Sequence, residues 1–214
     1  MKIAVPAYFP DRREYDALLN SENVSIVVLN PLNGPGKEKD LGYEKIIDKL
    51  RGKGIETIGY VHTSQATRGM NDVWADMLRY LTWYSLDGIF LDETPYQYQW
   101  QYFYPFSKAL QELGKKLIVN PGMVPQEDYI HIAYAILGFE NTLDVYRNSQ
   151  LPNWINKYPS DKFWHILHHT PGQSLEEALT ILKRRNVGHV YVTDMDYSKL
   201  PSYWQDEVDL TKVF

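Results

Sequence analysis

The chain has 214 residues, of which 44% are hydrophobic, and it carries a formal net charge of −5. This length suits one well-buried core, so we expect residues 1–214 to form a single domain. The acidic balance and the lack of a basic patch argue against nucleic acid as a partner, and the absence of cysteine excludes disulfides, thiolate chemistry and cysteine-bound zinc.

Membrane and export signals are missing from the sequence as written. No stretch approaches the about 18 to 20 apolar residues of a membrane span, and the apolar run at the start is too short for a signal peptide. We therefore expect no membrane partner and a cytoplasmic location. The alternative is an extracellular protein whose leader is absent from this chain.

Eight short apolar or β-branched runs recur along the chain. They are nearly continuous rather than alternating, which is typical of parallel strands covered on both faces. The predicted strands are residues 3–8, 25–30, 56–63, 88–93, 116–122, 134–140, 163–169 and 189–194.

Helical patterns separate most of these runs. Asp40 can cap a helix with Tyr43, Ile46, Ile47 and Leu50 on one face. Asn71 can begin a second helix, and Ser174 with Glu177 forms a capping box ahead of another. A further apolar face consists of Phe103, Phe106, Leu110 and Leu113.

Strands that alternate with helices in one domain of this size predict a compact single-domain (β/α)8 TIM barrel. An open doubly wound sheet is the alternative. The fifth unit is short and has the weakest helical pattern. In such barrels the active site lies at the carboxyl ends of the strands, so the polar residues that end these runs are candidates for function.

Two adjacent carboxylates, Asp92 and Glu93, end the fourth run in the stretch GIFLDETPY. Because strand side chains alternate, only one of them can point into the barrel mouth. We expect Asp92 to point inward with Phe90 and Glu93 to support it. On the sixth run, Glu140 shares the alternation of Gly138, a small residue that leaves room, so we pair Asp92 with Glu140 as the catalytic carboxylates; a rim salt bridge is the alternative.

Other polar and aromatic residues are weaker candidates. Arg68 follows the third run and could bind a carboxylate or a sugar hydroxyl, or be a solvated loop residue. Aromatic side chains follow the carboxylates and could form a sugar platform or pack on a helix; these are Tyr96, Tyr98 and Trp100. His168 and His169 lack the spacing of metal ligands on one face, so we predict no metal site.

Several motifs occur in a fixed order between residues 3 and 140: VPAYFP, VVLNPLNGPG, IGYVHT, DGIFLDE, IVNPG and GFE. This combination resembles the spherulin-4-like family, glycoside hydrolase family 135. The resemblance implies a (β/α)8 barrel that cleaves α-1,4-linked N-acetylgalactosamine polymers, an exopolysaccharide, without a metal. It also implies that Asp92, Glu93 and Glu140, in the DE and FE motifs, are the acidic active-site residues.

Our first hypothesis is a retaining endo-acting glycosidase with no cofactor and a polysaccharide or oligosaccharide partner. Asp92 is the nucleophile, and Glu140, kept protonated by burial and by the like charge of Asp92, is the general acid and base. Sugar hydroxyls are held by Tyr8, Asn30, Tyr60, Asn120 and Asp194. The alternatives are a non-catalytic carbohydrate-binding barrel and a metal-dependent polysaccharide hydrolase or deacetylase that uses His168, His169 and Asp194.

Overall fold

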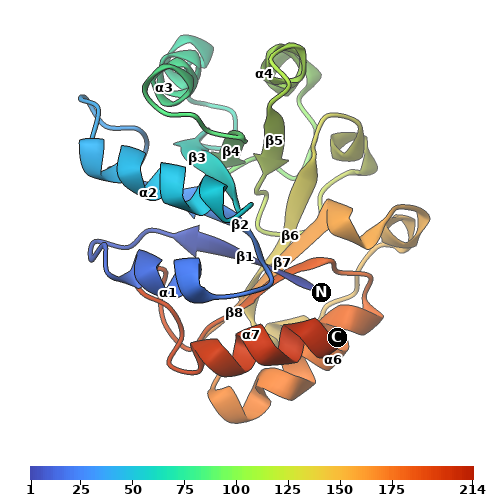
Figure 1. Ribbon diagram of the computed structural model, residues 1–214. Helices are drawn as coiled ribbons and strands as arrows, with labels where there is room; N and C mark the ends of the chain where they lie inside the picture. Colours follow the sequence, from blue (N-terminus) through green and yellow to red (C-terminus); the bar gives the residue numbers. More distant parts are fainter.

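The computed structural model describes residues 1–214 and contains one closed barrel of eight parallel strands in sequence order. Figure 1 shows the helices arranged around these strands. The barrel confirms the predicted (β/α)8 fold and rules out the open sheet. The strands are β1 (Lys2–Ala7), β2 (Val24–Leu29), β3 (Glu56–His62), β4 (Gly88–Asp92), β5 (Lys116–Val119), β6 (Ala135–Thr142), β7 (Phe163–His168) and β8 (His189–Val192).

Seven α-helices lie in the connections and after the last strand. They are α1 (Glu14–Asn20), α2 (Leu41–Gly52), α3 (Met70–Trp83), α4 (Trp100–Glu112), α5 (Leu143–Asn148), α6 (Leu175–Arg184) and α7 (Trp204–Val213). The short fifth unit has no α-helix, and a 3-10 turn at Glu127–His131 connects β5 to β6. Further 3-10 turns are Asn153–Lys157, Ser160–Lys162 and Gly172–Ser174.

The start of α2 follows the prediction. The Asp40 carboxylate accepts hydrogen bonds from the backbone N–H groups of Gly42 and Tyr43 at 2.7 and 3.3 Å, and so satisfies donors that have no partner within the helix. The predicted apolar face of this helix, from Tyr43 to Leu50, is buried. Local sequence was sufficient here because both the cap and the face lie within a few residues of each other.

The other two predicted helix starts are correct to within one residue, but the predicted capping box is absent. Helix α3 begins at Met70, one residue before Asn71, and α6 begins at Leu175, directly after Ser174. Ser174 ends a 3-10 turn and makes no capping hydrogen bond, because its φ of −100° and ψ of 1° are not the extended conformation of a capping residue. Leu113, assigned to an apolar face, is 60% exposed.

The barrel interior is filled by aromatic side chains. The ring of Phe90 stacks on Tyr60 with centroids 6.1 Å apart and meets Trp164 edge-on at 5.8 Å. In the register of β3 and β4, Tyr60 pairs with Phe90 and His62 with Asp92. Side chains two residues apart share a face, so Asp92 lies above Phe90 at the mouth of the barrel, as the alternation predicted.

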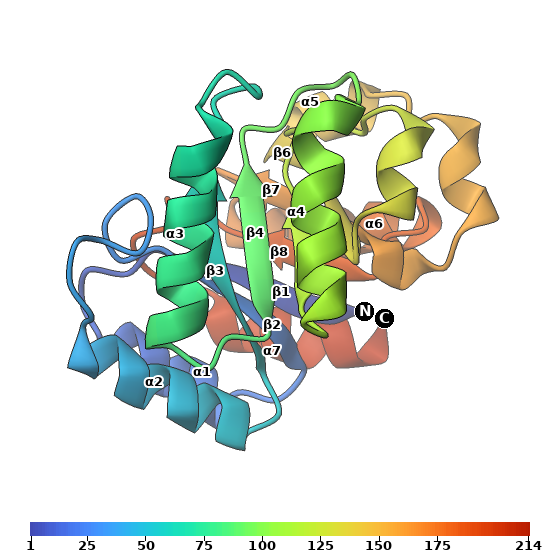
Figure 2. The same ribbon diagram turned by 90° about the horizontal axis from the view of Figure 1, so that it is seen from above.

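The two chain ends lie beside each other. The amino group of Met1 donates a hydrogen bond to the carbonyl of Thr211 at 3.2 Å, and the two views in Figures 1 and 2 place the N and C labels close together. Helix α7 thereby closes the ring of helices against β1. None of the helices is both long enough and apolar enough to cross a membrane.

Candidate active site

One amide joins the two predicted catalytic carboxylates. Asn120, directly after β5, donates through Nδ2 to Oδ1 of Asp92 at 2.7 Å and to Oε2 of Glu140 at 2.8 Å. The two carboxylate oxygens are therefore at most about 5.5 Å apart, the sum of these two distances. The predicted pairing of Asp92 with Glu140 across the mouth is present in the structure.

The orientation of the Asn120 amide is fixed by a third contact. Its Oδ1 accepts the backbone N–H of Gly122 at 2.8 Å, and a backbone N–H can only donate, so Nδ2 must face the carboxylates. Asn120 is 7% exposed, and both of its N–H groups are used inside the protein. We predicted that Asn120 holds a sugar hydroxyl, but the structure engages its donors with the carboxylates instead.

Glu140 has a second partner that sequence reasoning missed. The hydroxyl of Tyr197, in the loop between β8 and α7, donates to Oε1 of Glu140 at 2.6 Å. Tyr197 lies 57 residues from Glu140 in the chain, and the only hint of it is an aromatic side chain that follows the polar end of the last strand. Both oxygens of Glu140 are thus held by neutral donors.

Three tyrosines surround the carboxylates. The ring of Tyr8 meets Tyr60 edge-on at 5.5 Å and Tyr197 at 5.8 Å. Burial, and then the nearby carboxylates, raise the pKa of all three phenols far above the usual range. The hydroxyls therefore stay neutral. Of the predicted sugar ligands, Tyr8 and Tyr60 are brought to the carboxylates.

The surroundings of Asp92 shift the pKa of its carboxyl group. Burial raises the pKa of Asp92 to about 6, and the charge of Glu140 adds to the rise, while hydrogen bonds from Tyr60, the Glu93 N–H and Asn120 oppose it. At neutral pH this carboxyl is mostly ionised, as a nucleophile requires. We predicted that Glu140 stays protonated in the resting enzyme, and this remains a prediction.

Glu93 follows Asp92 at the end of β4, and its charge acts on the phenol of Tyr60. It is exposed, and its φ of 54° lies in the left-handed region that side-chain-bearing residues rarely adopt. Its carbonyl accepts Gln65 N–H at 2.8 Å and the Thr63 hydroxyl at 2.9 Å, and the same hydroxyl reaches the Asp92 carbonyl at 3.0 Å. Buried Thr63 therefore ties β4 to the loop after β3.

Gly138 does not have the role we assigned to it. Strand β6 is irregular between Leu137 and Phe139, so the simple alternation from Gly138 to Glu140 fails. A Cβ atom at Gly138 would lie 3.2 Å from the ring of His165 and 3.2 Å from Val124, not beside Phe90. The irregularity nevertheless leaves Glu140 pointing into the mouth, where Asn120 binds it.

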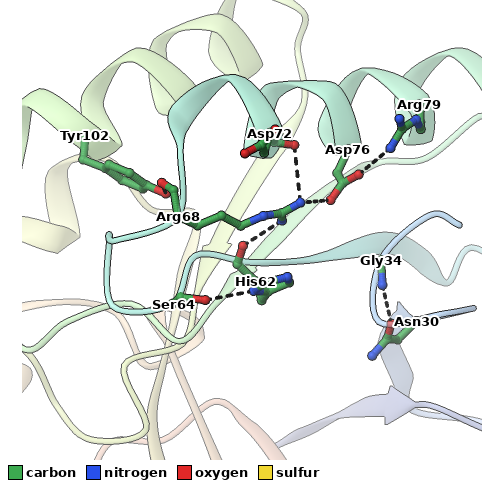
Figure 3. A network of polar contacts seen from close by, with 9 residues as sticks. All are labelled: Asn30, Gly34, His62, Ser64, Arg68, Asp72, Asp76, Arg79 and Tyr102. Atoms are coloured by element: carbon green, nitrogen blue, oxygen red, sulfur yellow. Dashed lines mark hydrogen bonds and ion pairs between the residues drawn. The ribbon is translucent and has the colours of Figure 1, made fainter.

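Arg68 is engaged by the protein rather than left free. Its guanidinium donates to Asp76 at 2.5 Å and to the carbonyl of His62 at 3.0 Å, and Arg79 binds the other oxygen of Asp76 at 2.8 Å. Figure 3 shows this side chain running along the start of α3. The hydroxyl of Tyr102 donates to the Arg68 carbonyl. A sugar contact by Arg68 would require these bonds to be exchanged.

The remaining predicted sugar ligands lie around the rim. Asn30 uses Oδ1 to accept the Gly34 N–H at 2.8 Å, which leaves its NH2 group without a partner in the protein (Figure 3). Asp194 accepts both the N–H and the hydroxyl of Ser202. Asn30 is thus partly available to a ligand, whereas Asp194 serves its own loop.

The aromatic loop after β4 divides into two kinds of ring. Tyr98 packs edge-on against buried Tyr129 at 5.0 Å. Trp100 stacks on Tyr104 at 3.9 Å and is 51% exposed, and Tyr96 is 52% exposed. Trp100 and Tyr96 therefore offer open faces, while Tyr98 contributes to packing.

The residues of the metal hypothesis do not form a ligand set. His168 and His169 contact each other through Nδ1 atoms 2.7 Å apart, and Asp194 is bound to Ser202. No group of three or more His, Asp or Glu side chains in the structure is placed to hold a metal ion.

Comparison with known proteins places the chain in a family. The family described as spherulation-specific family 4 matches residues 2–211. Spherulin-4 of Physarum polycephalum is 31% identical over 229 aligned positions, which cover 97% of this chain and 69% of that protein.

Solved structures agree with this assignment. The crystal structure of Aspergillus clavatus Sph3 in complex with GalNAc superposes with a TM-score of 0.84 at 25% identity, over 98% of this chain and 96% of that one. A chitinase from Chromobacterium violaceum shares the fold, with a TM-score of 0.67 at 10% identity and full coverage of both chains. The chain therefore belongs to the spherulin-4 family.

Proposed function

We propose that this protein is a glycoside hydrolase that cleaves an exopolysaccharide containing N-acetylgalactosamine. The observation that carries the proposal is the pair Asp92 and Glu140, with facing oxygens at most about 5.5 Å apart. Retaining glycosidases place their two carboxyl groups about 5 to 5.5 Å apart, whereas inverting enzymes need about 6.5 to 9.5 Å for a water molecule. The geometry supports the retaining mechanism.

The steps follow from this arrangement. Ionised Asp92 attacks the anomeric carbon while Glu140 gives its proton to the leaving oxygen, which takes the electron pair of the broken C–O bond. A glycosyl ester on Asp92 results. Water then attacks the same carbon, Glu140 accepts its proton, and Asp92 leaves as a carboxylate. Two inversions restore the starting configuration.

The sugar class is supported by a related structure. Sph3 of Aspergillus clavatus is described in complex with GalNAc and matches nearly the whole chain. The neutral phenols around the carboxylates and the open rings of Tyr96 and Trp100 suit the hydroxyls and faces of a hexosamine. We assign sugar contacts to Tyr8, Tyr60 and Asn30 on the same grounds.

The test is hydrolysis of a defined α-1,4-linked N-acetylgalactosamine polymer. We expect new reducing ends, and proton NMR of the first product should show the α-anomer. A first-formed β-anomer would indicate inversion and overturn the role of Asp92 as nucleophile. Binding of the polymer without new reducing ends would favour the carbohydrate-binding alternative and overturn the hydrolase.

A further inference from the structure

Asn120 lies between the carboxyl groups of Asp92 and Glu140, which would repel each other if both were ionised. Its two N–H groups are committed to Asp92 and Glu140, and the Gly122 N–H prevents the amide from turning over. A shared donor lowers the cost of holding two ionisable carboxyls this close, because it stabilises the charged form of each. Every hydrogen bond to these two carboxyl groups comes from a neutral donor.

This arrangement restricts where a proton can lie. Oδ1 of Asp92 and Oε2 of Glu140 both accept from Asn120, so a proton on either oxygen would weaken its bond to the amide; Asp92 also accepts from the Glu93 N–H, which can only donate. Oε1 of Glu140 instead faces the hydroxyl of Tyr197 at 2.6 Å. A neutral phenol can accept from protonated Oε1 and donate to ionised Oε1, so this contact survives both states.

We propose that Asn120 and Tyr197 are positioning residues that together assign the catalytic proton to Oε1 of Glu140, and that Asn120 is not a sugar ligand. The proposal deepens the proposed hydrolase and rests on it for the role of that proton. When the proton moves from Oε1 to the leaving oxygen, the Tyr197 hydroxyl turns from accepting to donating and stabilises the new carboxylate. Asn120 meanwhile keeps Asp92 ionised beside its neighbour.

The first test follows the titration of Asp92 in protein with 13C-labelled carboxyl groups. In the native chain the pKa of Asp92 lies near 6, and Asn120→Ala should raise it by about one unit because a donor to the charged form is lost. The acid limb of the kcat profile should move upward by the same amount. Asn141→Ala is the matched control, because the exposed side chain of Asn141 bonds only to the backbone N–H of Thr142 and should shift neither.

A different outcome would identify Asn120 as a sugar ligand. In that case Asn120→Ala would raise KM, while the titration of Asp92 and the acid limb of kcat stay in place. Circular dichroism and the melting temperature check that each variant is folded. If Asn120→Ala does not fold, the second test still decides the assignment of the proton.

The second test uses Tyr197→Phe, which removes one hydroxyl and keeps the ring. A sugar leaving group needs the proton from Glu140, whereas a nitrophenol of low pKa leaves without it. We expect kcat/KM, which reports the steps up to the glycosyl ester, to fall about 10- to 100-fold on the polymer and to change less than about threefold on a dinitrophenyl N-acetyl-α-galactosaminide. An equal loss on both substrates would overturn the assignment of the proton to Oε1.

The titration separates this inference from the proposed function. It requires no turnover, so a native chain that releases no reducing ends while Asn120→Ala still shifts Asp92 would contradict the hydrolase and support the positioning of the pair by Asn120. If the native chain hydrolyses the polymer but Asn120→Ala leaves the pKa of Asp92 unchanged, the result would support the hydrolase and contradict the positioning of the pair by Asn120.

Discussion

Two clusters of charged side chains flank β3 and β4, and they use their aspartates in opposite ways. Asp76, on α3, binds Arg68 and Arg79, so its charge is matched by two cations. Asp92, at the mouth, receives hydrogen bonds only from neutral groups, namely Tyr60, Asn120 and the Glu93 N–H. A carboxylate neutralised by arginine is committed to structure, whereas one held by neutral donors keeps its charge available for a substrate.

The largest effect should come from the mouth. Asp92→Asn and Glu140→Gln should each lower kcat by about three orders of magnitude or more, because each keeps the shape and removes the chemistry. The melting temperature should stay the same or rise, since each substitution removes an ionisable carboxyl group whose charge is costly to bury. Glu93→Gln, with an exposed side chain, should cost much less. A nearly inactive Glu93→Gln beside an active Asp92→Asn would reverse the assigned roles.

A third carboxyl group, that of Glu207, should affect how the stability of the fold depends on pH. Glu207 on α7 is fully buried, and only one of its oxygens has a partner, the Val192 N–H at 2.7 Å. Burial raises its pKa from 4.5 to about 8, so the native state binds this proton more tightly than the unfolded state. The free energy of unfolding should therefore fall between about pH 4.5 and 8, by at most about 1.4 kcal/mol per pH unit.

Glu207→Gln should remove this dependence. The melting temperature of the variant, relative to that of the native chain, should rise as the pH increases from 5 to 9. Asp206 is exposed on the same helix, so Asp206→Asn should show no such rise. Parallel melting curves for Glu207→Gln and the native chain across this range would mean that Glu207 is ionised in the fold.

Removing the partner of Arg68 should affect stability more than chemistry. Asp76→Asn leaves a mostly buried guanidinium without its counter-charge, and we expect a loss of about 2 kcal/mol in the free energy of unfolding. Because Arg68 also binds the His62 carbonyl, the loop that carries Thr63 should loosen and kcat should fall less than about tenfold. Urea denaturation and kcat measured together would test this; loss of activity without loss of stability would remove the distinction between the two aspartates.

The pH dependence of activity should identify Asp92 itself. Its pKa of about 6 places the acid limb of kcat/KM in that region, with activity falling about tenfold per pH unit below it as the nucleophile becomes protonated. The polymer can be assayed from pH 4.5 to 8 in buffers of constant ionic strength. An acid limb near pH 4 would show that Asp92 is more solvated than its burial implies.

The smallest effect concerns the open aromatic faces. Trp100→Ala should weaken polymer binding by about 1 kcal/mol, because the indole stacks on Tyr104 and meets Tyr98 edge-on, yet half of its surface stays open to a sugar. Tyr98→Ala serves as the contrast: it should reduce the melting temperature, since Tyr98 packs on buried Tyr129. Unchanged affinity of Trp100→Ala for the polymer would exclude this ring from the binding surface.

Local sequence determined the strands and helices of this protein and the strand ends that carry its candidate catalytic residues. Apolar runs separated by helical faces predict the barrel, the Asp40 cap lies within three residues of its partners, and strand alternation alone places Asp92 inward. These features depend on contacts between residues that are near in the chain, or on a periodicity that any parallel strand must obey.

Only the tertiary structure decided what each polar group binds. Asn120 is 28 residues from Asp92 and 20 from Glu140, and Tyr197 reaches Glu140 across 57 residues. The irregularity in β6 moves Gly138 off the face that alternation predicts, and Arg68 is held by an aspartate on a helix. Closing the barrel sets these distances, because each strand brings its own polar end to a common mouth, and no pattern within one segment records which ends will meet.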